Sequence, residues 1–95
     1  MDTLSTEPVF FSFGRVLITC GAEDKLHPAD VAAALRRHAR GDWGELCLQD
    51  QAENALALEE GFRLFSVYRD RRETRFYVIT EADRSLTTIL LPEEY

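Results

Sequence analysis

His38 is the side chain of this sequence best suited to acid–base chemistry, because an imidazole titrates near neutral pH. It follows Val31, Ala34 and Leu35 at helical spacing, so it lies on the apolar stripe of a predicted helix. Packing also explains such a histidine, and we expect it to contact Trp43 and to be held by hydrogen bonds. The sequence therefore leaves two roles open, a general base and a buried structural residue, and favours the second.

A second group of ionisable residues lies near the C-terminus, in the stretch TEADRSLTT at positions 80–88. Its charged members, Glu81, Asp83 and Arg84, are candidates for binding a ligand or a partner. A catalytic role would need a pocket on which they converge, whereas an Asp-Arg turn flanked by threonines is held by local hydrogen bonds alone. We therefore expect a structural turn between two strands here.

Asp50 and Asn54 are four residues apart on a predicted helix and share one of its faces. An aspartate suits the first turn of a helix, whereas asparagine is a poor helix former. Side-chain amides commonly satisfy buried backbone groups, so we expect Asn54 to tie down the Trp43 loop or a strand edge. Contact with a ligand is the alternative, and Trp43, Asp50 and Asn54 are the candidate binding residues of this region.

The spacing of the usual ligands gives no support to a cofactor or metal site. The sequence contains no glycine-rich phosphate loop, and neither cysteine belongs to a CxxC pair. His27, His38, Cys20 and Cys47 match no standard zinc spacing. We therefore expect no cofactor and no metal. Both thiols are expected to be reduced, with Cys20 in the core, and a disulfide between the two is the alternative.

Length and charge restrict the class of protein. The 95 residues suffice for one domain, which we expect at 11–95 after a flexible arm at 1–10. A net charge of −6 makes binding to nucleic acid unfavourable. The basic stretch RDRRETR at 69–75 is then predicted to be a solvated turn rather than a phosphate clasp. Without a signal peptide or a membrane-length apolar run, we expect a cytoplasmic location and no membrane contact.

The apolar pattern predicts an α+β fold in the order β-α-α-β-β-β. The first strand is expected over about 13–21 and the helices over about 28–40 and 49–60, with a glycine at the end of each helix. Three strands follow from Phe62 onward and form an antiparallel meander, on which the two helices pack.

The second helix has a predicted apolar face that includes Ala52, Ala55 and Leu56. Residues 23–60 carry nine acids and four bases, whereas residues 61–95 carry six of each. The helical layer is therefore expected to be the acidic layer, and the strand-rich half is neutral.

Several short motifs carry a resemblance that covers about residues 27–95. They are His27-Pro28, Trp43-Gly44, Asp50, Asn54, Gly61, Ser66-Val67-Tyr68, ITEADRS at 79–85, Thr87-Thr88 and LLPEEY at 90–95. Together they resemble a family of short bacterial proteins encoded on plasmids and integrated mobile elements, often labelled plasmid-related proteins. Phe76-Tyr77 departs from that family, in which a tryptophan is expected beside the ITE segment. The resemblance implies a bacterial, mobile-element context and no established chemistry.

The predicted order of elements also resembles, as a fold only, the compact toxins of the RelE/ParE group, which include ribosome-dependent ribonucleases. That likeness implies candidate acid–base residues at His38, Tyr68, Arg84 and Tyr95. Such toxins meet RNA with a basic surface on the sheet side, whereas the strand-rich half of this chain is neutral. Fold does not imply function, so the likeness supplies a hypothesis only.

Two functions therefore stand as hypotheses. The first is a noncatalytic accessory module that binds another protein, with an acidic helical face suited to a basic partner. The alternative is a RelE/ParE-like ribonuclease or toxin. Arginines clustered beside His38 or Tyr68 would favour the nuclease, and dispersed arginines with a continuous acidic face would favour the binding module. A homodimer is expected if the outer face of the sheet is apolar.

Overall fold

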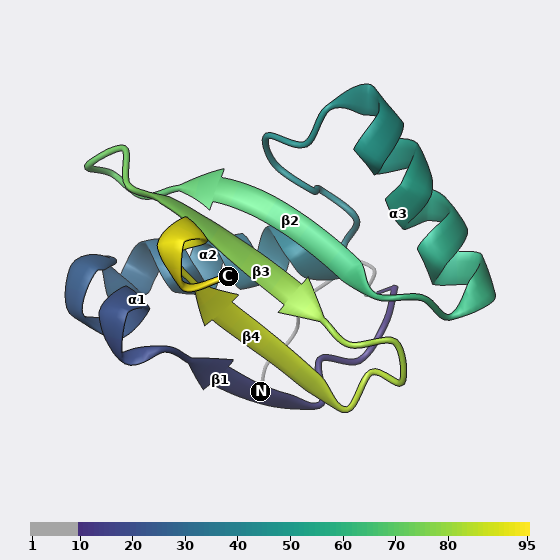
Figure 1. The fold of residues 1–95 in the computed structure, drawn as a ribbon, viewed down its shortest axis with the longest axis horizontal. Helices are drawn as coiled ribbons and strands as arrows, with labels where there is room; N and C mark the ends of the chain where they lie inside the picture. Colours follow the sequence, from purple (N-terminus) through teal and green to yellow (C-terminus); the bar gives the residue numbers. More distant parts are fainter. Residues whose placement is uncertain (1–9) are drawn as a thin grey trace, which may run out of the picture.

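The computed structural model describes residues 10–95 and shows an α+β fold built on one four-stranded sheet (Figure 1). Its elements are β1 (Arg15–Ile18), α1 (Cys20–Lys25), α2 (Pro28–Ala39), α3 (Leu48–Glu60), β2 (Leu64–Arg69), β3 (Arg75–Thr80), β4 (Leu86–Leu90) and the 3-10 turn η1 (Pro92–Glu94). The predicted class and the predicted order of elements are confirmed, with α1 as an additional short helix. The predicted arm at 1–10 lies outside the described residues except for Phe10.

The strand order is β1-β4-β3-β2, and the sheet is mixed. β2, β3 and β4 are antiparallel neighbours, as the meander prediction required. β1 instead runs parallel to β4, with Val16 beside Thr87 and Ile18 beside Ile89. The expectation of a purely antiparallel meander is therefore wrong at this edge. No turn joins β1 to β4, so the sequence carries no local signal of their pairing.

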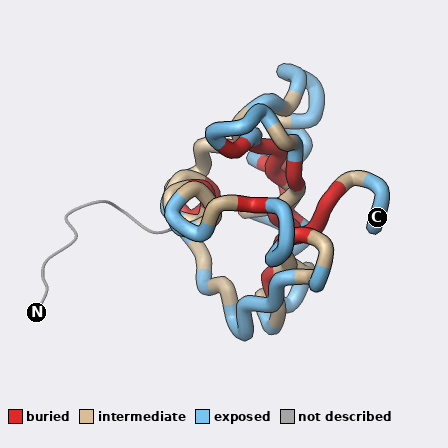
Figure 2. Tube along the Cα trace, turned by 90° about the vertical axis from the view of Figure 1, so that its left-hand side faces the viewer, coloured by how far each residue is buried: buried red, intermediate tan, exposed pale blue. Residues whose placement is uncertain are grey.

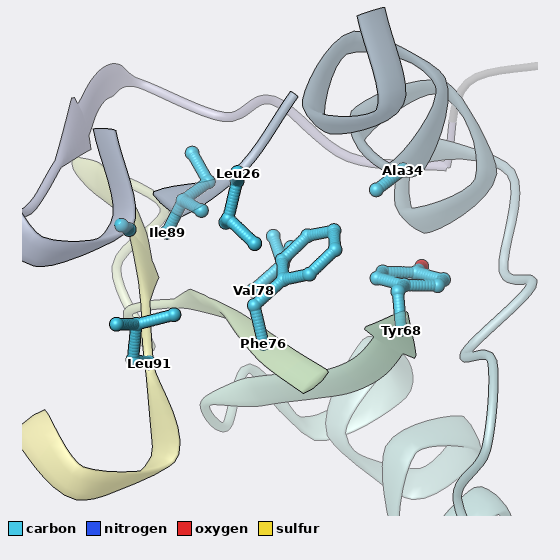
Figure 3. Packing of buried hydrophobic residues seen from close by; sticks show 8 residues of the cluster. Leu26, Ala34, Tyr68, Phe76, Val78, Ile89 and Leu91 are labelled. Atoms are coloured by element: carbon cyan, nitrogen blue, oxygen red, sulfur yellow. The ribbon is translucent and has the colours of Figure 1, made fainter. Parts of the chain in front are cut away.

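α1 and α2 cover one face of the sheet, which we call the inner face (Figure 1). Side chains alternate along each strand, and those that reach this face meet the two helices. The resulting core cluster, drawn in Figure 3, comprises Ala22, Leu26, Ala34, Tyr68, Phe76, Val78, Ile89 and Leu91. Full burial of a large apolar side chain contributes about 1.5–3 kcal/mol, so this cluster holds α1 and α2 on the sheet.

α1 begins directly after β1, where Thr19 is its N-cap. The Thr19 hydroxyl accepts a hydrogen bond from the Ala22 N–H at 3.1 Å. The strand therefore ends at Ile18 and not at the predicted residue 21, and Cys20 lies in the first turn of a helix. The expectation of a buried Cys20 is wrong, because Cys20 and Cys47 are both exposed and both thiols are free.

α2 and α3 begin and end close to the predicted residues. Pro28 starts α2, and Gly41, just beyond its C-cap, has a φ of 80°. Gly61 is the C-cap of α3 and has a φ of 78°. Glycine adopts these left-handed values without steric cost, so both predicted helix ends are confirmed.

α3 lies beside the β2 edge of the sheet rather than over a face of it (Figure 1). Asn54 and Ala57 are its buried residues, whereas Ala52, Ala55 and Leu56 are exposed. The predicted apolar face of this helix is therefore wrong. A helix against a strand edge buries only a narrow stripe, and the backbone groups of that edge favour a polar side chain within it.

The opposite, outer face of the sheet carries η1 and the C-terminal Tyr95 (Figure 1). The Tyr95 ring centroid lies 5.8 Å from those of Phe65 and Tyr77, which project from β2 and β3. Figure 2 shows the buried stretches of the chain gathered towards its centre, with exposed segments around them. The outer face is thus partly covered by the end of the chain itself.

Candidate functional site

The candidate base His38 lies at the centre of a buried chain of polar side chains on the inner face. Its Nδ1 is 2.5 Å from the Ser66 Oγ, and its Nε2 is 3.0 Å from the Thr80 Oγ1. Thr80 Oγ1 lies 2.7 Å from Thr87 Oγ1, and the Thr87 hydroxyl donates to the Phe13 carbonyl at 2.8 Å. These four side chains are fully buried, so none of them can contact a substrate in solution.

The Phe13 carbonyl fixes the direction of this chain of hydrogen bonds, because a carbonyl can only accept. The Thr87 hydroxyl therefore donates its proton to the Phe13 carbonyl and must accept a hydrogen bond from the Thr80 hydroxyl. Thr80 in turn must accept from His38, which places the imidazole proton on Nε2 and leaves Nδ1 to accept from Ser66. His38 is thus a neutral imidazole with both ring nitrogens satisfied.

Burial and neighbouring rings keep His38 neutral. Desolvation, followed by the positive charge of Arg84, lowers the pKa of His38 from 6.5 to about 3. The imidazole packs edge-on against Phe11 at 5.1 Å and against Trp43 at 5.5 Å between ring centroids. The structural interpretation of His38, packed on Trp43 and hydrogen-bonded, is confirmed.

Tyr68, the second candidate acid–base residue, is also buried on the inner face (Figure 3). Its hydroxyl donates to the Asp42 carbonyl at 2.6 Å, and the Arg37 guanidinium lies 4.9 Å from the ring centroid. Burial raises the pKa of Tyr68 above its ordinary value, so the phenol stays protonated. Tyr68 thereby joins the Trp43 loop to the sheet.

Arg84 points inward, towards the C-terminal end of α3. Its guanidinium donates to the carbonyls of Phe62 at 2.6 Å, Ala57 at 3.1 Å and Glu81 at 3.1 Å. The last turn of α3 contains no base of its own, so Arg84 supplies the cation that helix C-termini favour. Arg84 is therefore occupied in joining the 81–85 turn to α3.

The two acids of that turn are placed differently. The Asp83 carboxylate accepts from the Ser85 N–H at 3.0 Å and from the Ser85 hydroxyl at 2.6 Å, which lowers its pKa. Glu81 contributes backbone groups, its N–H donating to the Leu86 carbonyl. The stretch TEADRSLTT therefore forms a turn between β3 and β4 that local hydrogen bonds hold, as expected.

Carboxylates form ion pairs and hydrogen bonds with the basic stretch at residues 69–75. Arg69 pairs with Glu45 at 2.9 Å, and Arg71 pairs with Asp30 at 3.0 Å. The Asp70 carboxylate accepts from the backbone N–H groups of Arg72, Thr74 and His27, which fixes the loop itself. Paired arginines at a hairpin tip do not make a phosphate clasp, so this geometry agrees with a solvated turn.

The four residues implied by the toxin likeness do not converge. His38 and Tyr68 are buried on the inner face, whereas Tyr95 is 65% exposed on the outer face. Arg84 lies at the end of α3, bonded to backbone carbonyls. A reacting group could not contact all four side chains at once.

A groove between α3 and the outer face of the sheet brings together other predicted residues. It has a volume of about 600 Å³, and we call it the α3 groove. Its lining residues are Leu46, Asp50, Glu53, Asn54, Leu56, Ala57, Phe62, Arg63, Phe65 and Tyr95. The candidate residues Asp50, Asn54 and Tyr95 therefore meet here, while Trp43, Glu81, Asp83 and Arg84 lie elsewhere.

Asn54 positions α3 against the sheet and so forms one wall of the groove. Its amide donates to the Phe65 carbonyl at 2.7 Å and accepts from the Phe65 N–H at 3.3 Å. These are both backbone groups that Phe65 directs away from β3. The expectation that Asn54 ties a strand edge is confirmed.

The Trp43 loop pairs with Val67, the next residue of β2 whose backbone groups face the same edge. The Val67 N–H donates to the Trp43 carbonyl at 3.2 Å, and the Glu45 N–H donates to the Val67 carbonyl at 2.8 Å. Gly44, between them, has a φ of 74°, and a Cβ there would lie 1.9 Å from the Val67 carbonyl oxygen. Only glycine permits this approach, so Trp43 and Gly44 position α3 without lining the groove.

The groove has an apolar floor and a charged rim. Phe65 and Ala57 lie within it, and Leu56 and Phe62 at its margin are more than half exposed. Asp50 and Glu53 stand on the α3 side. Opposite them, Arg63 donates to the Tyr95 hydroxyl at 2.5 Å. Such a surface can hold an apolar side chain with a cation beside it.

The acidic character is strongest in α3. This helix carries Asp50, Glu53, Glu59 and Glu60 and no base, whereas α2 has Arg36 and Arg37 in its last turn. The acids of the expected acidic helical layer are therefore concentrated in the helix that forms the groove. Phe62, Arg63 and Phe65 were not predicted as site residues, because their approach to Tyr95 arises only when the strands pair.

Residues 10–95 show neither a cluster of metal ligands nor a helix that could span a membrane. In this range no three His, Cys, Asp or Glu side chains come close enough to hold a metal ion together. None of the helices described here is long and apolar enough to cross a bilayer.

Comparison of the chain with protein-family models, with curated proteins and with solved structures finds no match. The geometry of the α3 groove therefore carries the functional argument.

Proposed function

We propose that this protein is a noncatalytic protein-binding module that takes a basic, partly apolar segment of another protein into the α3 groove. The supporting observation is the groove itself, an open depression of about 600 Å³ with an apolar floor and acids on one rim. In keeping with the family resemblance, we place this module in the cytoplasm of bacteria, as an accessory protein of plasmids or mobile elements.

The apolar side chains of the groove indicate that a partner covers them, because their exposure to water is unfavourable. Leu56 is 52% exposed and Phe62 is 54% exposed, although both line a concave surface. Large apolar side chains that adjoin a concave surface are typical of interaction sites. A partner side chain that packs on Phe65 would cover both Leu56 and Phe62.

The charge of the groove favours a basic partner. α3 carries four acids and no base, and two of the acids, Asp50 and Glu53, line the groove. Opposite charges across an interface speed association and select the partner more than they add affinity. Binding should therefore weaken as salt concentration rises.

The alternative of a ribonuclease or toxin has less support. Arg69 and Arg71 are paired with acids, Arg84 is bonded to carbonyls, and His38 and Tyr68 are buried. RNA cleavage by the purified protein would nevertheless contradict the proposal.

The test uses a partner captured from a bacterial host and then purified. Asp50→Lys with Glu53→Lys should weaken its affinity at least about tenfold, because two groove acids become bases. The matched control is Glu59→Lys with Glu60→Lys, which makes the same charge change on the same helix but outside the lining. Fluorescence anisotropy would measure both affinities. An equal loss in the two double variants would contradict a role for the groove.

A further inference from the structure

The two edges of the sheet differ. At the β2 edge, Asn54 bonds both backbone groups of Phe65, and the Trp43 loop bonds those of Val67. The β1 edge has no such cover from any residue of the 10–95 range. Uncovered strand edges are templates for pairing with another chain.

The backbone of β1 directs half of its polar groups outward. The Arg15 N–H donates to the Ser85 carbonyl and the Thr19 N–H to the Ile89 carbonyl, both at 3.0 Å. Because backbone groups alternate along a strand, the N–H and C=O of Val16 and Ile18 point away from β4. Val16, Leu17 and Ile18 are also 45%, 43% and 37% exposed.

We propose that a second copy of this chain pairs here, with β1 antiparallel to β1 about a two-fold axis at Leu17. In this register Val16 of each copy exchanges both backbone hydrogen bonds with Ile18 of the other copy. All the outward groups of the strand are then satisfied. Leu17 faces Leu17 of the second copy in a non-hydrogen-bonded pair, where side chains approach most closely.

The charges near β1 suit a second copy. The register sets Arg15 opposite Thr19 of the other copy, and the Thr19 hydroxyl donates to the Glu94 carboxylate at 2.6 Å. Arg15 of each copy therefore comes near Glu94 of the other copy, once on each side of the axis. Opposite charges in these places favour self-pairing over pairing with an unrelated strand.

The distribution of net charge along the chain agrees with pairing of two copies through β1. Residues 10–25 contain two bases, Arg15 and Lys25, and two acids, Glu23 and Asp24, so their net charge is zero. The acidic α3 lies at the opposite edge of the sheet. Pairing through β1 thus keeps the acidic helices of the two copies apart and leaves both α3 grooves open.

The interface is small, because β1 has only four residues. It should bury less than the roughly 1,200–2,000 Å² of a stable protein–protein interface. A reversible dimer with a dissociation constant on the order of micromolar or weaker is therefore expected.

Sedimentation equilibrium of the full chain over a wide concentration range tests the proposal. The wild type should show a monomer–dimer equilibrium, and Leu17→Lys should weaken it at least about tenfold by setting like charges at the axis. Leu56→Lys is the matched control, because Leu56 is also about half exposed but lies on α3. A wild type that stays monomeric, or a dimer lost in Leu56→Lys and kept in Leu17→Lys, would overturn the proposal.

Cross-linking tests the register without depending on the stability of the lysine variant. Leu17→Cys, with Cys20→Ser and Cys47→Ser, should form a disulfide-linked dimer on mild oxidation, since the two residues face each other at the axis. Leu56→Cys in the same background should not. Failure of Leu17→Cys to cross-link at concentrations where the wild type is dimeric would overturn this register.

Discussion

The side-chain amide of Asn54 pairs with both backbone groups of Phe65, donating at 2.7 Å and accepting at 3.3 Å. It acts as one residue of an additional strand, so α3 is fixed to the sheet by hydrogen bonds as well as by packing. The same contact closes the β2 edge and forms a wall of the α3 groove. Edge protection and the binding surface thus depend on one side chain.

Asn54→Ala should lower the free energy of unfolding by about 1–3 kcal/mol, because both backbone groups of Phe65 lose their partner in a partly buried place. Urea denaturation would measure the change. Gln49→Ala, on the exposed side of the same helix, is the control and should change it by less than about 0.5 kcal/mol. Similar values for the two variants would show that the amide pair contributes nothing.

The buried His38 predicts a loss of stability in mild acid. Its pKa is about 3 in the folded protein and 6.5 in the unfolded chain. Below pH 6.5 the unfolded chain therefore binds a proton that the folded chain does not. The free energy of unfolding should fall with decreasing pH, by up to about 1.4 kcal/mol per pH unit.

Denaturant melts between pH 7 and pH 5 would show this slope before most carboxylates titrate. His38→Gln lacks the titrating group and should lose that part of the slope. Nuclear magnetic resonance of the imidazole gives a second measurement, with the proton on Nε2 throughout. Titration of His38 near pH 6.5 in the folded protein is the outcome that would falsify a buried, neutral imidazole.

Arg84 has a φ of 61°, which strains any residue other than glycine. Arg84→Ala should lower the free energy of unfolding by about 1–3 kcal/mol, because the carbonyls of Ala57 and Phe62 lose a charged donor. Arg84→Gly loses the same donor but relieves the backbone, so it should be about 1 kcal/mol more stable than Arg84→Ala. Thermal and urea unfolding would compare the two, and a less stable glycine variant would contradict the argument.

Gly44 and Gly61 provide a matched pair for the β2 edge. Both have left-handed φ values, 74° and 78°. A Cβ at Gly44 would meet the Val67 carbonyl oxygen at 1.9 Å, whereas a Cβ at Gly61 would meet no atom of residues 10–95 within 4 Å. Gly61→Ala should cost about 1 kcal/mol of stability from backbone strain alone. Gly44→Ala should lower the free energy of unfolding by clearly more, because the Trp43 loop would have to move away from β2. Equal costs in urea denaturation would mean that the bridge to Val67 adds no stability.

The sequence predicted the local elements well because their signals are local. The proline at position 28 marks the start of α2, and the glycines at 41 and 61 mark the ends of α2 and α3. α1 was missed because its signal is a single N-cap, Thr19, before only six helical residues. The apolar face of α3 was wrong because helical periodicity does not show whether a helix covers a face of a sheet or an edge.

The sequence also indicated roles for single residues. An asparagine inside a helix predicted a backbone partner, and a histidine on an apolar stripe predicted a packed imidazole. Neither pattern could identify the partners, because Phe65 lies eleven positions from Asn54 and Thr80 lies forty-two from His38.

The sequence by itself determined the fold class, the order of elements and the absence of standard phosphate or zinc motifs, because these depend on composition and short-range spacing. Only the tertiary structure decided that β1 joins β4 in parallel, that Arg84 turns inward, and that Phe62 and Tyr95 meet α3 around one groove. These outcomes depend on contacts between distant segments, where burial and hydrogen-bond satisfaction of the whole domain outweigh any local preference.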